Sequence, residues 1–538
     1  MPRVLLVGID GAPPSLLDHW MEEGELPALA SLRDGGCSGV LRSTANLSSP
    51  SAWTSISTGV NPGKHGIFGF FDRLPGTWSF RQNDSRARAA EPYWITASRA
   101  GLSTATLNMP CSWPVDEVRG IQVAGWLAPS DRSEGFAHPR SLAEELRARF
   151  GPYPLHSDIQ RLVAAGRHEA ARDRILTNLR RKGEIAEGLL LRERWELMTV
   201  VFSDTDAAAH YYWHLSDESH PRHCPRIRRD VGEIMLMAYR EVDRALGRLI
   251  ERLSDLDAVL VVSDHGAGPS RDGALYLPGL IDSLGWQVRG HGLLRSVTRT
   301  LQQHLPAGVK HRLAHALAAR GGDQTTRLLL GEIDRRSTHL LCFYEGGRAD
   351  LWLRPEPCCP EAFHREVRET LLECRDLRSG RPAIAEVVLS EDAYHGMQTA
   401  RAPDLLVRWR EDLVAVGGLR CQKAESTTPE LHPLQTCDHR AEGVIIAAGR
   451  GIATGERLEA TVEDVAPTLL HLCGLPVPSE YDGRVITEMV GGEPEVAVGS
   501  PGQMDDPAEV GGRISSETLA RLRGLGYLAD DSSASSRS

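Results

Sequence analysis

The sequence predicts an α/β fold, in which a mostly parallel sheet is covered by helices. Four short apolar runs, rich in β-branched residues, are typical of strands buried on both faces; they span residues 4–9, 198–202, 258–262 and 444–448. Helical patterns lie between them, among them 231–253 and 461–472. Strand and helix alternating over several hundred residues favours a layered sheet.

Composition and charge exclude several classes of protein. The 538 residues are 41% hydrophobic and 25% charged, which is enough apolar material for a large core and excludes a disordered, collagen-like or disulfide-scaffold protein. The 61 basic residues against 72 acidic ones give a net charge of −11, which argues against a general nucleic-acid binder and a polybasic membrane binder. Only four of the basic residues are lysine: Lys64, Lys182, Lys310 and Lys423.

The cysteines and the apolar segments bear on location. Ten cysteines are scattered without a CxxC pair, which favours reduced, mostly buried thiols over disulfides or a zinc finger. The apolar run at the N-terminus is too short for a signal peptide, and no run approaches the ~20 apolar residues that span a bilayer. We therefore expect a soluble, cytoplasmic protein.

The α/β core is expected in three pieces, residues 1–110, 196–269 and 401–490, separated by two insertions at 111–195 and 270–400. Within the first insertion, 141–191 is almost entirely helix-forming. Within the second, 293–320 is helical and basic with one apolar face; we favour a cap helix over a membrane-surface or partner-binding helix. Residues 491–538 have the composition of a linker and flexible tail, with a short amphipathic segment at 519–527.

Acidic and histidine side chains follow the predicted strands. Asp10 comes directly after the first run, and Asp264 with His265 comes after the third. Ligands in α/β sheets bind at the carboxyl ends of strands, although a single Asp there is more often a turn or helix-cap residue. Asp206 and His210 follow the second run four residues apart, which places both on one face of a helix.

A sixth candidate, His439, precedes the fourth run. Together the six residues offer carboxylate and imidazole ligands, which suit zinc or manganese and do not suit calcium. Six ligands exceed the four of a closed zinc site, so the set predicts two metal ions with open positions for substrate or water.

A motif upstream of these residues carries a family resemblance. Residues 47–59 read LSSPSAWTSISTG and residues 61–66 read NPGKHG. With the six candidate ligands in order, these segments resemble the alkaline phosphatase superfamily, specifically the type I phosphodiesterases and nucleotide pyrophosphatases. The resemblance covers roughly residues 1–110, 195–270 and 400–490, and it implies a three-layer α/β/α sandwich with helical cap insertions.

The resemblance also implies roles for single residues. The family's nucleophile lies nine residues before the Thr of a Thr-Gly pair, which selects Ser49; the Pro that often follows two residues after the nucleophile would select Ser48 instead. Ser49 is favoured because residues 53–59 then align without a gap. One metal ion falls to Asp10, Ser49, Asp264 and His265, and the other to Asp206, His210 and His439.

The implied reaction is hydrolysis of a small phosphoester, most of all a phosphodiester or nucleotide pyrophosphate, through a covalent phosphoseryl intermediate on Ser49. Phe70 stands where nucleotide pyrophosphatases have an Asn, and Asp72 is close by. No Arg lies beside Ser49, although Arg42 or a residue of an insertion could reach the phosphate as a clamp. The missing clamps favour diesters over monoesters.

Rival interpretations share the fold. A sulfatase would need Arg where Ala52 stands, and a cofactor-independent phosphoglycerate mutase would need further Arg and Lys residues. A phosphomonoesterase and a metal-stabilised binding protein without activity complete the set of rivals. His65 is expected to be structural, and the aromatic residues Trp53 and 211–213 are expected either in the core or beside the substrate. The sequence indicates neither the substrate-binding residues nor an oligomeric state.

Overall fold

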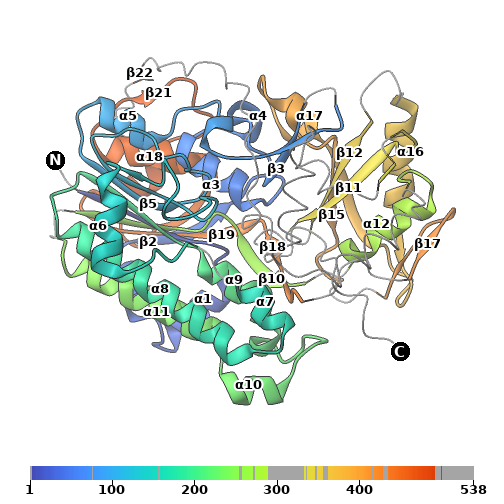
Figure 1. Ribbon diagram of the computed structural model, residues 1–538, viewed down its shortest axis with the longest axis horizontal. Helices are drawn as coiled ribbons and strands as arrows, with labels where there is room; N and C mark the ends of the chain where they lie inside the picture. Colours follow the sequence, from blue (N-terminus) through green and yellow to red (C-terminus); the bar gives the residue numbers. More distant parts are fainter. Residues whose placement is uncertain are drawn as a thin grey trace, which may run out of the picture.

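The computed structural model describes most of the chain (Figure 1). The described residues are 3–74, 77–155, 158–253, 257–270, 273–288, 333–334, 336–345, 348–354, 361–413, 417–427, 434–490 and 498–499. The expected cap helix at 293–320 and the amphipathic segment at 519–527 lie outside these residues.

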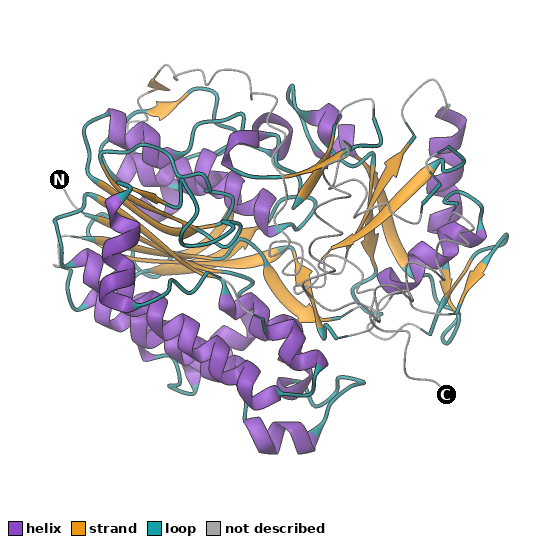
Figure 2. Cartoon of the chain, in the orientation of Figure 1, coloured by secondary structure: helices purple, strands orange, loops and turns teal. Residues whose placement is uncertain are grey.

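A nine-stranded sheet forms the centre of the molecule, in the order β20-β2-β19-β9-β1-β8-β5-β6-β7 (Figure 2). The strands are β1 (Val4–Ile9), β2 (Cys37–Arg42), β5 (Thr104–Met109), β6 (Gly120–Ala124), β7 (Ala137–His138), β8 (Leu197–Phe202), β9 (Ala258–Val262), β19 (Glu442–Gly449) and β20 (Arg457–Thr461). The block from β9 through β1, β8 and β5 to β6 is parallel, whereas β19 runs antiparallel to both of its neighbours. The sheet is therefore mostly parallel.

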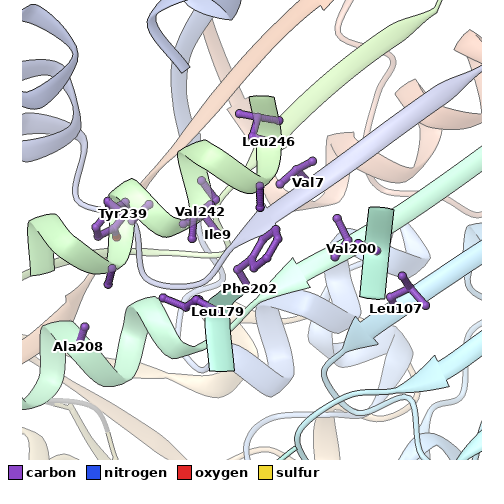
Figure 3. Packing of buried hydrophobic residues seen from close by; sticks show 14 of the residues in the cluster. Val7, Ile9, Leu107, Leu179, Val200, Phe202, Ala208, Tyr239, Val242 and Leu246 are labelled. Carbon is purple, nitrogen blue, oxygen red and sulfur yellow. The ribbon is translucent and has the colours of Figure 1, made fainter. Parts of the chain in front are cut away.

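Helices cover both faces of the sheet because successive strand residues point to opposite sides. In β1, Leu5, Val7 and Ile9 join one apolar cluster, and Val4 and Leu6 join the other. Figure 3 shows β1 and β8 side chains packing against the helices of the first face. That face carries α2 (Pro27–Gly35), α8 (His168–Leu190), α9 (Asp204–Ser216) and α11 (Ile234–Ile250); the other carries α3 (Ser49–Thr58), α5 (Tyr93–Arg99) and α18 (Val465–Leu472).

A second, smaller unit lies beside the core, at the right of Figure 1. Its antiparallel sheet has the order β11-β12-β15-β14, and its own apolar cluster includes side chains of α12 and α16. The elements are α12 (Gly273–Ser283), β11 (Leu340–Glu345), β12 (Arg348–Leu353), α16 (Glu361–Leu372), β14 (Ile384–Leu389) and β15 (Leu405–Trp409). We refer to this unit as the cap.

Shorter elements connect these layers. They are α1 (Pro14–Glu22), α4 (Pro62–His65), β3 (Phe71–Arg73), β4 (Phe80–Gln82), α6 (Ser141–Phe150), α7 (Ile159–Ala164), α10 (Pro225–Val231), β10 (Gly266–Pro269), β13 (Arg375–Asp376), α17 (Ser390–Ala393), β16 (Leu419–Arg420), β17 (Glu425–Ser426), β18 (Cys437–Arg440), β21 (Val477–Pro478), α19 (Thr487–Val490) and β22 (Val498–Gly499), with 3-10 turns at Ser85–Ala87, Thr399–Arg401 and Val462–Asp464.

The structure confirms the predicted fold class, and the four apolar runs are β1, β8, β9 and the interior of β19. It differs from the predicted boundaries in two places. Strands β6 and β7 belong to the central sheet although they lie within 111–195, for which the sequence predicts a helical insertion. Strand β15 pairs between β12 and β14, so the cap extends past residue 400 and is built on a sheet.

Two further findings bear on the composition argument. The eight cysteines that the structure describes are all free thiols. Among the helices in the described part of the chain, none combines the length and the apolar composition needed to cross a membrane.

Candidate active site

Three neighbouring strands of the central sheet end at one edge and deliver the acidic residues there. Strand β1 lies between β8 and β9 and is parallel to both. Asp10 directly follows β1, Asp206 lies in the first turn of α9 after β8, and Asp264 follows β9. All three side chains are buried. Residues from distant parts of the sequence therefore meet because parallel neighbours end on the same side.

His439 reaches the same place through a separate two-stranded ladder. Strands β10 and β18 are antiparallel, and His439 pairs in register with Ala267. Because β10 begins directly after His265, the ladder lays the two imidazoles face to face, with ring centroids 3.7 Å apart and planes inclined by 19°. The ladder thus joins His439 to the edge formed by β9, β1 and β8.

Ser49 enters the site at the start of α3. Ser48 is the N-cap residue of this helix and Ser49 is its first helical residue. The Ser49 Oγ lies 2.9 Å from His265 Nε2 and 3.4 Å from Asp10 Oδ1. This geometry favours Ser49 over Ser48 as the reactive hydroxyl.

The ligand atoms of the buried residues form two overlapping groups around Asp206. In one group Asp206, His210 and His439 offer atoms that all lie within 4.8 Å of one another. In the other group Asp10, Asp206 and His265 also offer ligand atoms that all lie within 4.8 Å of one another. Asp264 is the remaining predicted ligand, and its Oδ2 lies 3.3 Å from His265 Nε2. All six predicted ligands are therefore brought together.

Backbone carbonyls orient the three imidazoles. His210 Nδ1 lies 3.1 Å from the Cys437 carbonyl, and His439 Nδ1 lies 2.7 Å from the Leu47 carbonyl. His265 Nδ1 lies 2.9 Å from the carbonyl of Gly266. A carbonyl only accepts, so each Nδ1 carries a hydrogen, and the Nε2 of each ring is the atom that faces the other candidate ligands and could bind a cation. Metal-binding histidines usually donate the hydrogen of their other ring nitrogen to a carbonyl or carboxylate in the same way.

Asp10 and Asp264 lie where burial and neighbouring carboxylates disfavour their charged forms. Burial raises the pKa of Asp10 well above its usual range, and the charges of Asp264 and Asp206 raise it further. Burial, followed by the charge of Asp206, does the same to the pKa of Asp264. Asp206 Oδ1 and Asp264 Oδ2 are buried and accept no hydrogen bond from the residues that the structure describes. Because buried acceptors are rarely left unpaired, these oxygens fit ligands of a cation.

The donor set therefore fits two divalent cations. Three carboxylates, three imidazole lone pairs and a serine oxygen converge within one buried volume, and the mixture of oxygen and nitrogen ligands suits zinc or manganese. Asp206 belongs to both groups of ligand atoms, so the site divides into two halves that meet at this residue. We call these halves the Asp10 half-site (Asp10, Ser49, Asp264, His265) and the Asp206 half-site (Asp206, His210, His439).

Three supporting residues were not recognised from the sequence in this role. Trp53 Nε1 donates a hydrogen bond of 3.2 Å to Asp10 Oδ2, so this indole holds a ligand. Thr205 Oγ1 donates to the carbonyl of Asp10 at 2.7 Å. Gly11 N lies 3.3 Å from Asp264 Oδ1 and donates to it. Only the adjacency of Gly11 to Asp10 and of Thr205 to Asp206 could have suggested these roles.

Residues that the sequence suggested for the substrate side lie elsewhere. Asp72 is fully buried and bonds to Arg401 at 3.0 Å. Arg42 is exposed and lies 3.7 Å from Glu442. Phe70 is buried against Trp126, with ring centroids 5.1 Å apart. These contacts give Asp72 and Arg42 structural partners in place of a phosphate.

The aromatic segment after His210 belongs to the core. Tyr211, Tyr212 and Trp213 are all buried and join the apolar cluster on the α8/α11 face of the sheet. His65 is structural, as expected: its Nε2 lies 3.0 Å from Ser55 Oγ, and its Nδ1 accepts from the backbone N–H of Ile67 at 3.1 Å.

Comparison with known proteins gives a family and a fold. A family model described as type I phosphodiesterase / nucleotide pyrophosphatase matches residues 4–432. His439 lies beyond the matched residues, and the β10–β18 ladder is what connects it to them. A comparison with curated protein sequences gives no match.

Solved structures with the same fold include phosphonoacetate hydrolase from Sinorhizobium meliloti 1021. Its complex with phosphonoacetate is 17% identical, with a TM-score of 0.54, and the match covers 88% of this chain and 96% of that one. Its complex with phosphonoformate has the same identity and coverage and a TM-score of 0.53. Human ectonucleotide pyrophosphatase/phosphodiesterase 5 is 14% identical over 89% of this chain and 97% of its own, with a TM-score of 0.47.

Proposed function

The chain belongs to the type I phosphodiesterase / nucleotide pyrophosphatase family, and from this premise we propose that it hydrolyses phosphodiester or nucleotide pyrophosphate bonds at a two-cation site, with Ser49 as the nucleophile. The single observation that carries the proposal is the position of the Ser49 hydroxyl. It lies at the start of a helix, 2.9 Å from His265 Nε2 and 3.4 Å from Asp10 Oδ1, beside six converging ligands.

The chemistry follows from this position. Ser49 Oγ gives up its proton and attacks phosphorus, and the bond from phosphorus to the leaving oxygen breaks as the new bond from Oγ to phosphorus forms. The leaving oxygen departs with the bonding electron pair and takes up a proton. Water then attacks the phosphoseryl group in a second displacement that restores the Ser49 hydroxyl.

The other residues hold the reacting atoms. Asp10, Asp264 and His265 surround the serine oxygen, and Asp206, His210 and His439 occupy the opposite side, where we place the leaving group. When bound, two cations supply positive charge that favours the Ser49 alkoxide and offsets charge on the phosphate oxygens. Zinc is the favoured metal, with manganese as the second choice.

The substrate class rests on the side chains that the sequence suggests as partners of the phosphate. The positive charge of Arg42 and the negative charge of Asp72 are both engaged with other side chains. A diester carries one negative charge per phosphate and needs less neutralisation than a monoester, so a diester is favoured. The cytoplasmic location remains a prediction from the sequence.

Replacing the nucleophile tests the proposal. We expect Ser49→Ala to lower kcat on a bis-aryl phosphodiester by at least about 10³-fold, a loss that persists at saturating concentrations of divalent cation. The matched control is Ser48→Ala, which removes the neighbouring hydroxyl at the N-cap position and should retain most of the activity. Unchanged turnover by Ser49→Ala would exclude Ser49 as the nucleophile.

A substrate panel distinguishes the rival hydrolases. The same wild-type preparation is assayed on a bis-aryl phosphodiester, an aryl phosphomonoester and an aryl sulfate. The proposal predicts the highest kcat/KM on the diester. Preference for the monoester would favour a phosphatase, and preference for the sulfate would favour a sulfatase.

A further inference from the structure

The carboxylate of Asp204 is buried and bonded on both of its oxygens by one face of α8. Asp204 is the first residue of α9 and precedes the ligand Asp206 by two positions. Lys182 Nζ donates to its Oδ2 at 2.6 Å, and Asn178 Nδ2 donates to its Oδ1 at 2.8 Å. Because Asn178 and Lys182 are four residues apart on α8, both donors come from one side of that helix. Together they clamp the start of α9.

This ion pair is unusual in its burial. Side-chain exposure is 4% for Lys182 and 6% for Asp204, whereas the lysines at 64 and 423 are 33% and 59% exposed. Burying two charges costs desolvation that their attraction only partly offsets, and apolar replacements of such pairs are often no less stable. A gain in stability therefore does not explain well why this pair is buried. Buried ion pairs are better explained where they hold neighbouring residues in one position.

The same turn of α9 is held from the opposite side by β1. Thr205 Oγ1 donates to the carbonyl of Asp10 at 2.7 Å, and Lys182 Nζ also donates to Ser203 Oγ at 3.0 Å. The three residues that precede Asp206 are thus tied either to α8 or to the end of β1. The Asp206 carboxylate is left to lie between the two half-sites.

We propose that Lys182 is a positioning residue for the Asp206 half-site. Through Asp204 it fixes the first turn of α9, and thereby the direction in which Asp206 and His210 present their ligand atoms. The Asp10 half-site takes Asp10 and Asp264 from the ends of β1 and β9, so the clamp reaches it only indirectly, through Asp206 and through the Thr205 bond to the Asp10 carbonyl. The segment around α8 then has a function beyond covering the sheet: it supports one of two cation positions. This inference rests on the proposed function, because it presupposes two cations.

Cation binding tests the inference without recourse to activity. Protein stripped with a chelator is titrated by calorimetry with Zn²⁺ alone, and separately with Mn²⁺ alone. For Lys182→Met we expect one of two cations to bind about 10- to 100-fold more weakly than in the wild type, with the other weakened less. The matched control is Arg180→Ala, on the same helix, which removes the ion pair between the exposed Arg180 and Glu241 and leaves Glu241 its second pair with Arg244. It should bind both cations as the wild type does.

A second variant guards against a failure to fold. Lys182→Met alone leaves the Asp204 charge buried and unpaired, whereas Lys182→Met with Asp204→Asn leaves no buried charge at this pair. The double variant should fold and still show the weakened cation. The inference is overturned if either folded variant binds both cations with wild-type affinity. A wild-type protein that binds fewer than two divalent cations would instead refute the proposed function.

Discussion

Gly11 has no room for a side chain beside Asp206. Its φ is +67°, and a Cβ atom built on it would lie 2.8 Å from Asp206 Oδ1. The same residue donates its backbone N–H to Asp264 Oδ1 at 3.3 Å. The left-handed backbone and the close approach therefore both require glycine, and both serve the orientation of ligand carboxylates.

We predict that Gly11→Ala weakens divalent cation binding by about 10-fold or more, because the added methyl group displaces Asp206. The variant should also lose about 1 kcal/mol in free energy of unfolding from its positive φ. Calorimetric titration with Zn²⁺ and thermal unfolding measure the two effects. Gly24→Ala is the matched control, since Gly24 has a φ of +76° and an added Cβ there would meet no described atom within 4 Å. If both variants bind cations like the wild type, the contact with Asp206 is not limiting.

At the scale of residues, the sequence indicates the candidate ligands that the structure brings together, but not the residues that hold them in place. Asp10, Asp264 and His265 closely follow apolar runs, and this position is enough to predict them as candidate ligands. Trp53, on α3, donates a hydrogen bond to Asp10, which lies 43 residues away in the sequence. No local sequence pattern predicts this contact. Whether Ser48 or Ser49 faces the cluster depends on where α3 begins, which spacing alone left open.

Helices α3 and α4 are joined by a histidine that stays neutral. His65 is fully buried between Ser55 Oγ and the backbone N–H of Ile67. Burial lowers its pKa from 6.5 to about 3, and the charges of Arg401 and Arg88 act in the same direction. The folded protein therefore binds this proton far more weakly than the unfolded chain does.

The sign of the pH effect follows from this difference. A depressed pKa contributes stability that is present above pH 6.5 and is lost as the pH falls from 6.5 toward 3. We predict that this histidine alone removes about 2 kcal/mol of unfolding free energy between pH 7 and pH 5. Denaturant titrations of wild type and His65→Gln across this range measure it, and the variant should show a shallower decline. His19→Gln, at an exposed histidine, is the control; equal slopes for all three proteins would contradict the prediction.

At the scale of elements, apolar continuity decided which strands were recognised. β1, β8 and β9 are nearly uninterrupted apolar runs rich in Val and Leu, and the sequence predicts them. β5 and β6 carry Thr, Asn and Gln at buried positions, so they were not recognised although they lie in the same sheet. Some of these polar groups make specific contacts: Gln122 Oε1 accepts from the backbone N–H of Asp116 at 2.8 Å, and Asn108 Oδ1 accepts from the Tyr153 hydroxyl.

For the molecule as a whole, the cap and the core are joined by specific side-chain contacts. Arg73, on the strand β3 of the core, places its guanidinium 5.0 Å above the ring of Trp352 in the cap and pairs with Asp404 at 3.2 Å. Beside α4, Asp482 accepts from Asn61 at 2.9 Å and lies 3.0 Å from His395 Nε2. Contacts of this kind link segments hundreds of residues apart.

The overall architecture could be predicted as a class, but not its boundaries. The order of strands and helices indicated a layered sheet, and the family resemblance supplied the sandwich. Strand partners decide where a unit ends, and they depend on hydrogen bonds between distant segments. For this reason the sequence places β6 and β7 in an insertion and β15 in the core. Their pairing instead places β6 and β7 in the central sheet and β15 in the sheet of the cap.

The central claim is that residues from three strand ends, one helix start and one ladder hold two cations beside Ser49. The most direct measurement is a crystal structure of the wild-type protein grown with Zn²⁺ or Mn²⁺, with anomalous scattering recorded at the absorption edge of that metal. We predict two anomalous peaks about 4 Å apart, one on each side of Asp206, with Ser49 Oγ next to the peak in the Asp10 half-site. A single peak, or peaks that Asp10, Asp206 and Asp264 do not contact, would contradict the account.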